Sequence, residues 1–327
     1  MENPGQPDAK FIAALVDASY QRIHDHLLRT PLKNDVVDGI RLKCENLQMT
    51  GSFKFRGALS KLSLLPRGSK IITASTGNHG LGVAQAATIY GHDVTVFLPL
   101  KANARKKEKL KRLGVELKEV KGDSLAAELA GKAFATEHGL TWVSPYNDLA
   151  VIAGQGTIAK EILEQVNMLH IIDNPEKVDK IYITIGGGGL ISGIAGYFNV
   201  YAPHAEIIGC QPVNSPEMYL SQLAGHVVMA PEELPTLSDG SAGPLEEDSI
   251  TFGLCRSLVD RYILVTEDDI QKAIRDIFKN HEMVIEGAAG VAYAAALLDT
   301  KRKADEKVVV VLCGGNIDPV VHSEICN

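Results

Sequence analysis

The chain has 327 residues, of which 45% are hydrophobic and 22% charged, and 33 Lys and Arg against 40 Asp and Glu give a net charge of −7. This composition is typical of a globular enzyme or binding protein with enough apolar material for two cores, and it excludes disordered and collagen-like chains. The acidic balance argues against nucleic acid as a partner, and no apolar run approaches the ~18 residues that span a membrane.

The N-terminal segment has no basic region followed by an apolar one, so no secretory signal is expected and the predicted location is the cytoplasm. The five cysteines are far apart and form no CxxC pair, which predicts thiols rather than a disulfide framework or a zinc site. The one basic cluster, Lys101 to Arg112, is interpreted as the solvated face of a helix.

Short β-branched runs alternate along the chain with segments whose apolar residues recur about every 3.6 positions. Strands are predicted at Lys70 to Ala74, Asp93 to Leu98, Val178 to Ile185, Ala205 to Cys210 and Lys307 to Leu312. Helices are predicted at His79 to Tyr90, Ser124 to His138, Gly156 to Val166, Ile191 to Val200, Glu267 to Lys279 and Glu286 to Leu297. The alternation predicts an α/β fold with mostly parallel strands and helices on both faces. Such sheets bind ligands beyond the carboxyl ends of their strands.

A run of four glycines, Gly186, Gly187, Gly188 and Gly189, joins a predicted strand to a predicted helix. Without Cβ atoms the backbone can adopt positive φ and direct several N–H groups at one anion, next to a helix N-terminus. The run lacks the GxGxxG and GK[ST] spacings of dinucleotide and P-loop sites. It therefore predicts a different phosphate site, and a purely structural turn is the alternative.

A second glycine-bearing turn, Ser75-Thr76-Gly77-Asn78-His79-Gly80, follows the strand that ends at Ala74. Its hydroxyls, amide and free backbone N–H groups at a helix N-terminus suit a carboxylate, although Ser75 or Thr76 can also serve only as an N-cap.

A third motif places Lys54 between Phe53 and Phe55. Burial disfavours the ammonium form, which leaves a neutral amine able to attack a carbonyl and form a Schiff base. A surface lysine that extends its ammonium group into solvent is the alternative.

These three motifs, with Thr50-Gly51-Ser52 before Lys54 and Cys313-Gly314-Gly315-Asn316 near the C-terminus, resemble in order the pyridoxal-phosphate enzymes of the tryptophan-synthase fold type. The resemblance is to the serine/threonine dehydratase and serine racemase branch, and it extends from about Arg29 to Asp318. It implies two lobes with mostly parallel, twisted sheets. Residues 1–68 and 148–327 would form the large cofactor-binding domain, and residues 69–147 a small mobile domain that closes over it.

The resemblance also implies roles for single residues. Lys54 would hold pyridoxal 5'-phosphate as a Schiff base, Phe53 would lie against its ring, and Asn78 would contact the ring's 3-oxygen. Gly186 to Gly189 would bind the phosphate, Gly240 would lie beside the cofactor, and Cys313 would face the pyridine nitrogen. Ser75, Thr76, Asn78 and His79 would receive the substrate carboxylate. Taken without the resemblance, Cys313 is an inert buried thiol.

The implied reaction converts a β-hydroxy amino acid such as L-threonine or L-serine to a 2-oxo acid and ammonia. Lys54 would remove the α-proton, the cofactor phosphate would protonate the leaving hydroxyl, and an aminoacrylate would be released and hydrolysed. A neutral thiol at Cys313 makes the ring a weaker electron sink than an aspartate would, which suits β-elimination. Dehydratases for hydroxyaspartate or phenylserine are alternatives within this class.

Three departures from the family pattern bear on the function. Thr76 stands where the racemases have the serine that acts as acid and base on the opposite cofactor face, so racemisation of serine or aspartate is expected to be secondary. Gln211 replaces a carboxylate where metal-dependent racemases bind Mg²⁺ or Ca²⁺, which predicts no metal and leaves Glu217 as the remaining candidate ligand. The chain ends soon after Asp318, without the regulatory domain of biosynthetic threonine deaminases, which favours a catabolic role.

The other hypotheses are cysteine-synthase-like β-replacement and a non-enzymatic sensor of a nucleotide or phosphate ligand on a Rossmann-like sheet. Cysteine synthases have no histidine after their asparagine turn, whereas this chain has His79 there. A sensor would give Lys54 no function. The family often forms homodimers, so a dimer is expected.

Overall fold

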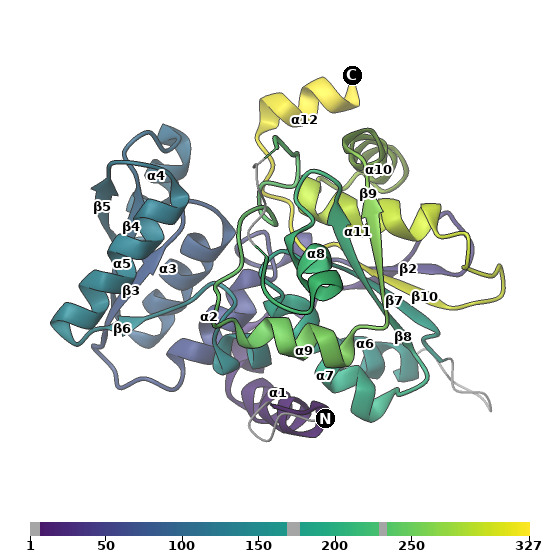
Figure 1. Ribbon diagram of the computed structural model, residues 1–327, viewed down its shortest axis with the longest axis horizontal. Coiled ribbons are helices and arrows are strands. Elements are labelled where there is room, and N and C mark those ends of the chain that lie inside the picture. Colours follow the sequence, from purple (N-terminus) through teal and green to yellow (C-terminus); the bar gives the residue numbers. More distant parts are fainter. Residues whose placement is uncertain (1–6, 169–176, 229–233) are drawn as a thin grey trace.

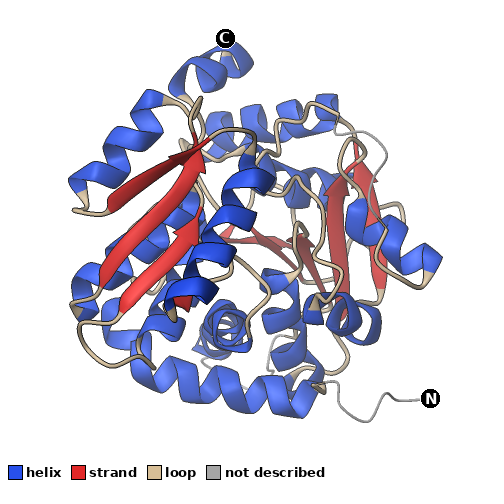
Figure 2. Ribbon diagram, turned by 60° about the vertical axis from the view of Figure 1, so that its left-hand side comes forward, coloured by secondary structure: helices blue, strands red, loops and turns tan. Residues whose placement is uncertain are grey.

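Two β-sheets covered by helices make up the computed structural model, which describes residues 7–168, 177–228 and 234–327 (Figure 1, Figure 2). The larger sheet has the order β1-β2-β10-β7-β8-β9 and the smaller sheet β5-β4-β3-β6. All neighbouring strands are parallel except β1 and β2. The strands of the larger sheet are β1 (Leu32–Asn34), β2 (Ile40–Lys43), β7 (Lys180–Thr184), β8 (Glu206–Pro212), β9 (Arg261–Val265) and β10 (Val308–Val311). Those of the smaller sheet are β3 (Lys70–Ala74), β4 (Asp93–Pro99), β5 (Glu116–Val120) and β6 (Thr141–Trp142).

The helices lie between and around these strands. Those up to residue 168 are α1 (Ala9–Ile23), η1 (His24–His26), η2 (Glu45–Leu47), α2 (Lys54–Leu62), α3 (Asn78–Tyr90), α4 (Ala104–Arg112), α5 (Ser124–His138) and α6 (Leu149–Met168), the two labelled η being 3₁₀ helices. The remainder are α7 (Gly189–Tyr201), α8 (Glu217–Ala224), α9 (Ile250–Leu258), α10 (Glu267–His281), α11 (Gly287–Leu298) and α12 (Pro319–Cys326). None of the described helices is long and apolar enough to cross a membrane.

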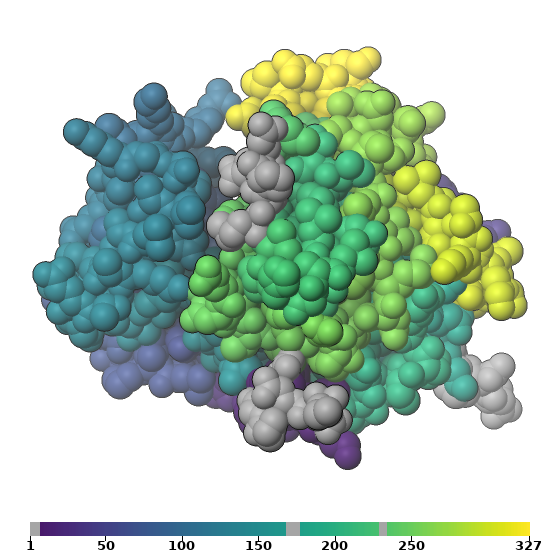
Figure 3. Space-filling view, viewed as in Figure 1, coloured from purple at the N-terminus to yellow at the C-terminus, as the bar shows by residue number. Residues whose placement is uncertain are grey.

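The smaller sheet buries apolar side chains on both faces because successive residues of a strand point to opposite sides. Ile71 and Val96 pack with the helices α2 and α3, whereas Ile72 and Phe97 pack with Ala135 of α5. Figure 3 shows this part of the chain as a separate mass beside the rest of the molecule.

The larger sheet is also covered on both faces, by α10 and α11 on one side and by α1, α6 and α7 on the other (Figure 1). Its central strand β10 is four consecutive, fully buried valines. An unbroken apolar run of this kind is typical of a parallel strand with helices on both sides.

The predicted α/β class and the mostly parallel strands are therefore confirmed, and each predicted strand matches an observed one within two residues at either end. One predicted helix boundary is wrong: α6 begins at Leu149, seven residues before the predicted start at Gly156. Gly154 and Gly156 lie inside α6, where missing side chains let other helices approach. A Cβ on Gly154 would come within 2.6 Å of the Gly57 Cα in α2, and one on Gly156 within 2.8 Å of the Gly193 carbonyl oxygen in α7.

The division into residues 1–68 with 148–327 and 69–147 remains a prediction. The strands of the smaller sheet all fall within the second range. The apolar core beneath that sheet, however, includes Phe55 and Leu59 of α2 and Val151 of α6. If residues 69–147 moved as a unit, the smaller sheet would therefore have to shift relative to α2 and α6, with which it shares this core.

Four buried charged side chains join α2 to its neighbours. Arg56 donates from Nε and Nη2 to the two Glu45 oxygens at 2.7 and 2.8 Å. Its Nη1 and Nη2 donate to the two Glu161 oxygens at 2.8 and 2.9 Å. Lys43 also donates to Glu161, at 2.6 Å. Arg56, Lys43 and Glu45 have no exposed surface, and Glu161 has almost none. Two cations thus neutralise two carboxylates inside the protein.

We expect Arg56→Met to lower the free energy of unfolding by about 3–5 kcal/mol, because it leaves Glu45 without a cation in a buried environment. The measurement is urea unfolding of the purified proteins. Arg112→Met is the control, since Arg112 is an exposed partner of Glu108 and such pairs contribute less than about 1 kcal/mol. Equal midpoints for the two variants would contradict a stabilising role of the buried cluster.

Candidate active site

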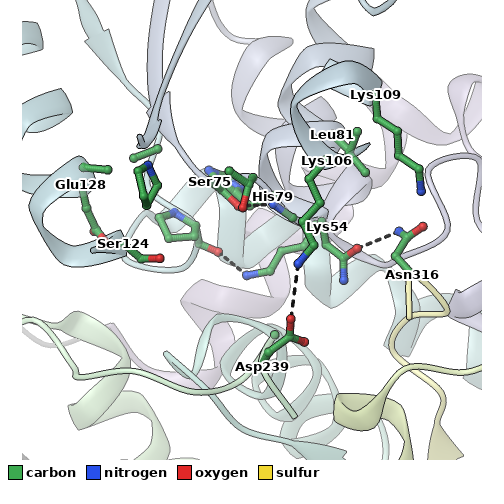
Figure 4. Close-up of a pocket in the computed structure, with 18 of the residues that line it drawn as sticks. Lys54, Ser75, His79, Leu81, Lys106, Lys109, Ser124, Glu128, Asp239 and Asn316 are labelled. Atoms are coloured by element: carbon green, nitrogen blue, oxygen red, sulfur yellow. Dashed lines mark hydrogen bonds and ion pairs between the residues drawn. The ribbon is translucent and has the colours of Figure 1, made fainter. Parts of the chain in front are cut away.

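Lys54 lies between the two sheets, at the first residue of α2, and three adjoining cavities share its side chain. The strands β3, β7 and β10 all end toward this place, so the turns that follow them meet there. The first cavity, of about 360 Å³, contains Ser75, Thr76, Asn78 and His79 (Figure 4). The motifs predicted from the sequence are therefore brought together around one amine.

Two backbone hydrogen bonds set the position of Lys54 relative to the turn after β10. The Phe53 N–H donates to the Cys313 carbonyl at 3.0 Å, and the Gly315 N–H donates to the Gly51 carbonyl at 2.9 Å. Gly51 has φ of 75°, in the left-handed region that glycine adopts without strain, and its absent side chain leaves room for Asn316. The segment before Lys54 and the turn at Cys313 consequently form one short antiparallel unit.

The Lys54 side chain is partly exposed to the cavities, and no carboxylate of the described residues is paired with its amine. Its Nζ donates to the Pro145 carbonyl at 2.9 Å and lies 5.1 Å from the centre of the Phe53 ring. Burial lowers the pKa of Lys54 from 10.5 to about 8, against the opposing effect of the neighbouring Cys313 and Glu286. A lysine in this state supplies a substantial fraction of neutral amine near neutral pH, as a nucleophile or a base requires.

The four glycines form the turn between β7 and α7. Gly188 has φ of 85°, and no side chain caps the N-terminus of α7, so its first N–H groups receive no side-chain partner. A Cβ on Gly187 would overlap the Tyr146 ring, and one on Gly186 would come within 2.8 Å of the Ser241 carbonyl oxygen. Glycine is therefore required for the turn to fit between its neighbours, and backbone amides at a helix N-terminus that no side chain caps suit a phosphate.

One further cavity brings together all of the residues predicted to contact the cofactor. They are Phe53, Lys54, Asn78, Gly186, Gly187, Gly188, Gly189, Gly240 and Cys313. Burial raises the pKa of the Cys313 thiol well above its ordinary value, so this side chain stays uncharged. Their individual contacts to a cofactor remain predictions.

A buried carboxyl group, Glu286, lies at the centre of this cavity and was not predicted from the sequence. The Asn78 amide donates to its two oxygens at 2.8 and 2.9 Å, and the Asn316 backbone N–H donates to it at 3.1 Å. The Asn316 amide also donates to the Asn78 side-chain oxygen at 2.7 Å. These bonds orient the Asn78 amide so that its nitrogen faces Glu286 and its oxygen faces Asn316. Burial raises the pKa of Glu286 to about 7, although the bond from Asn78 opposes this.

The turn after β3 presents its polar groups to the first cavity. The Ser75 hydroxyl accepts a hydrogen bond from the Gly77 N–H at 3.1 Å, and Thr76 lines the same wall. His79 is more deeply buried, with Nε2 within 2.9 Å of the Thr73 hydroxyl and 3.1 Å of the Val143 carbonyl. Burial lowers the pKa of His79 to about 3, so it is neutral, and only its Nδ1 side is available to a ligand.

Glu217, the candidate metal ligand, lies away from these groups at the start of α8. It is buried and accepts a hydrogen bond from the Ser215 hydroxyl at 2.7 Å. Gln211 is occupied by the Tyr219 N–H and the Ser215 carbonyl. Within the part of the chain that the structure describes, no group of three His, Cys, Asp or Glu side chains could hold a metal ion.

This arrangement fits pyridoxal phosphate, because a glycine turn at a helix N-terminus, a half-buried lysine without a carboxylate partner and a neutral thiol surround one cavity. The arrangement thus suits an enzyme that uses this cofactor. The family model described as "Pyridoxal-phosphate dependent enzyme" matches residues 23–314, and the chain belongs to that family.

The curated relatives include an L-threonine ammonia-lyase of Thermotoga maritima, 39% identical over 90% of this chain and 71% of that protein. A catabolic L-threonine dehydratase of Staphylococcus aureus is 35% identical over 93% and 88%. Among solved structures, threonine deaminase isoform 2 of Solanum lycopersicum superposes with a TM-score of 0.88 at 28% identity, over 99% and 89% of the two chains. Maize serine racemase gives 0.86 at 28% identity, over 95% of each chain. The predicted tryptophan-synthase-like fold and cofactor are thereby confirmed.

Glu286, Asn316 and Tyr146 belong to the site but were missed from the sequence as functional residues. For Glu286 a signal was present, since a lone carboxylate stands in the apolar run Met283 to Ala289 and must find a buried partner. Tyr146 gave no comparable signal, because its contact with Gly187 joins distant parts of the chain.

We expect the rate at which pyridoxal phosphate combines with the cofactor-free protein to rise about tenfold per pH unit and to level off near pH 8. The reason is that the reacting neutral form of Lys54 increases until its pKa is passed. Growth of the visible absorbance band, followed from pH 6 to 10, gives the rate, and N-acetyl-lysine serves as the unburied control. A rate that still climbs above pH 9 would show an unperturbed lysine.

Proposed function

We propose that this protein is a pyridoxal-phosphate-dependent ammonia-lyase that converts L-threonine or L-serine to a 2-oxo acid and ammonia. The carrying observation is the Lys54 amine, which lies between the glycine turn, the neutral Cys313 and the Ser75–His79 turn. The relatives named L-threonine ammonia-lyase and dehydratase, at 35–39% identity, support this reaction class. We extend the proposal to serine because its β-hydroxyl is the same leaving group.

In this reaction the cofactor, when bound, withdraws electrons from the substrate's α-carbon. The Ser75–His79 turn would hold the substrate carboxylate with its hydroxyls, its amide and the N-terminus of α3. The Lys54 Nζ would take the α-proton, and its lowered pKa matches this role near neutral pH. The β-hydroxyl would leave with a proton as water, and hydrolysis of the remaining enamine would give the oxo acid and ammonia.

The second candidate function is racemisation. Thr76 supports it, because its hydroxyl lies in the same cavity as Lys54 and could serve as a second proton donor. The similarity to maize serine racemase also favours it. The neutral Cys313 favours elimination instead, since a weaker electron sink gives less time for reprotonation.

We also propose a homodimer in the cytoplasm whose small lobe closes over the substrate. Four of the five cysteines are buried as free thiols, which suits a reducing compartment. Closure is supported by the contact between Lys106 of α4 and Asp239, whose atoms are 3.5 Å apart across the cavity mouth (Figure 4). Closure of this kind would exclude water during elimination.

The purified protein with cofactor should absorb in the visible range and yield 2-oxo acid from L-threonine and L-serine in a coupled assay. Lys54→Ala should abolish both the protein-linked absorbance and the oxo acid, because it removes the attachment point and the base together. Lys61→Ala, on the same helix but paired with Asp148, is the control and should retain both. Inversion of serine without oxo acid would favour the racemase, and turnover by Lys54→Ala would remove Lys54 from the reaction.

Thr76→Ala should reduce racemisation at least tenfold more than dehydration, because only racemisation needs a proton donor on the face opposite Lys54. Chiral chromatography of residual L-serine and the oxo-acid assay measure the two reactions on one sample. Thr88→Ala, whose hydroxyl bonds to the Ala84 carbonyl on α3, is the control. Equal losses in both reactions would contradict the assignment of the two faces.

A further inference from the structure

A second cavity, of about 760 Å³, opens from Lys54 past Pro145 and lies between α5 and the segment 239–248. The β-substituents of serine and threonine are a hydrogen atom and a methyl group, which need only a small part of this space. The cavity is therefore large enough to admit a longer side chain beyond the β-carbon.

The lining of this second cavity is strongly acidic. Its carboxylates are Asp123, Glu128, Asp239, Glu246, Glu247 and Asp248. Its only cations among the described residues are Lys54 and Lys132, and Lys132 is paired with Glu246. Asp239 is paired with Lys106 of α4, and attachment of the cofactor would use the Lys54 amine, which leaves Glu128 without an ion-pair partner among the described residues.

Glu128 and Asp239 are the carboxylates of this group that line both the first and the second cavity, and Asp239 is paired with Lys106 of α4. Glu128 is half-buried on α5, a helix whose N-cap Asp123 accepts a hydrogen bond from the Ala126 N–H at 2.9 Å. Glu128 makes no hydrogen bond or ion pair to another described residue. Burial and the nearby Glu246 raise its pKa, against the opposing effect of Lys132 and Lys54. An incoming cation would offset the cost of burying its charge.

The two α4 lysines of the first cavity lie on one side of Lys54, where Lys106 is paired with Asp239, and Glu128 lies on the other side (Figure 4). The α-carboxylate of a substrate suits the first side, near the Ser75–His79 turn. The side chain is then directed toward Glu128, where an acidic group such as that of hydroxyaspartate would meet a like charge.

We propose that Glu128 selects β-hydroxy amino acids whose side chain ends in a cation, an ammonium or guanidinium group beyond the β-carbon. This inference rests on the proposed ammonia-lyase function and names its substrate class. Glu128 acts as a specificity residue: it contacts the distal cation and takes no part in proton transfer at the α-carbon.

The test compares two substrates of equal chain length, 3-hydroxyornithine and the uncharged 3-hydroxynorvaline. For the unmodified holoenzyme we expect kcat/KM to be at least tenfold higher with the cationic substrate. In Glu128→Gln, which keeps the shape and removes the charge, this ratio should fall at least tenfold, mostly through KM. Glu137→Gln, at an exposed position of the same helix, should leave the ratio unchanged.

The outcomes separate this inference from the proposed function. Oxo acid from threonine, with a ratio near one in the unmodified enzyme or an unchanged ratio in Glu128→Gln, would overturn the role of Glu128 and keep the lyase. An equal fall of kcat for both substrates would also overturn it, in favour of a catalytic role. No oxo acid from any hydroxy amino acid would reject the proposed function itself. If Glu128→Gln does not fold, the substrate ratio of the unmodified enzyme decides.

Discussion

The buried pairing of Arg56 with Glu45 and Glu161 is the constraint on which the geometry of the site depends. Arg56 follows Lys54 by two residues on α2, and its two carboxylate partners come from the segment after β2 and from α6. A guanidinium group offers donors in a fixed plane, so two bidentate partners determine both its position and its orientation. Such a cluster adds little net stability over apolar packing, but misplacing either partner leaves a buried charge unpaired. The first turn of α2, and Lys54 with it, is consequently held in one place.

The pKa values of Lys54 and Arg56, two cations in the first turn of α2, are shifted in opposite directions. Arg56 has a full set of carboxylate partners, which holds its pKa above the ordinary value, whereas Lys54 has only the Pro145 carbonyl. Burial therefore outweighs the opposing effect of Cys313 and Glu286 on Lys54 and favours its neutral amine. A paired lysine would be an ammonium ion and a poor nucleophile. The cluster around Arg56 thus supplies rigidity while leaving the reactive amine two residues away free of ion pairs.

The parts of this structure that sequence could predict are those set by local physics. The strand at Lys70 to Ala74 and the helix at Ser124 to His138 follow from residue periodicity, and the glycine turn follows from the lack of Cβ atoms. The strand Arg261–Val265 was missed; it lies at the edge of the larger sheet and buries only its last residue. The start of α6 was misplaced because its glycines serve contacts with α2 and α7. The hydrogen bonds of Glu286 join residues 208 positions apart, which no local pattern reveals.

The groups around Lys54 differ in charge. Burial disfavours the charged forms of Cys313 and Glu286, whereas the α4 lysines and Glu128 are charged groups on other sides of the cavity. Cys313 remains a thiol and Glu286 has a pKa of about 7, so the end near the turn after β10 carries little fixed charge. A cofactor ring held against these groups would gain no strong counter-ion from the protein, which would favour loss of a β-substituent. The α4 lysines and the Glu128 carboxylate lie instead toward the open side. Under the proposed function, the buried end of the site would set the type of reaction, and the charged groups of α4 and α5 would set the choice of substrate.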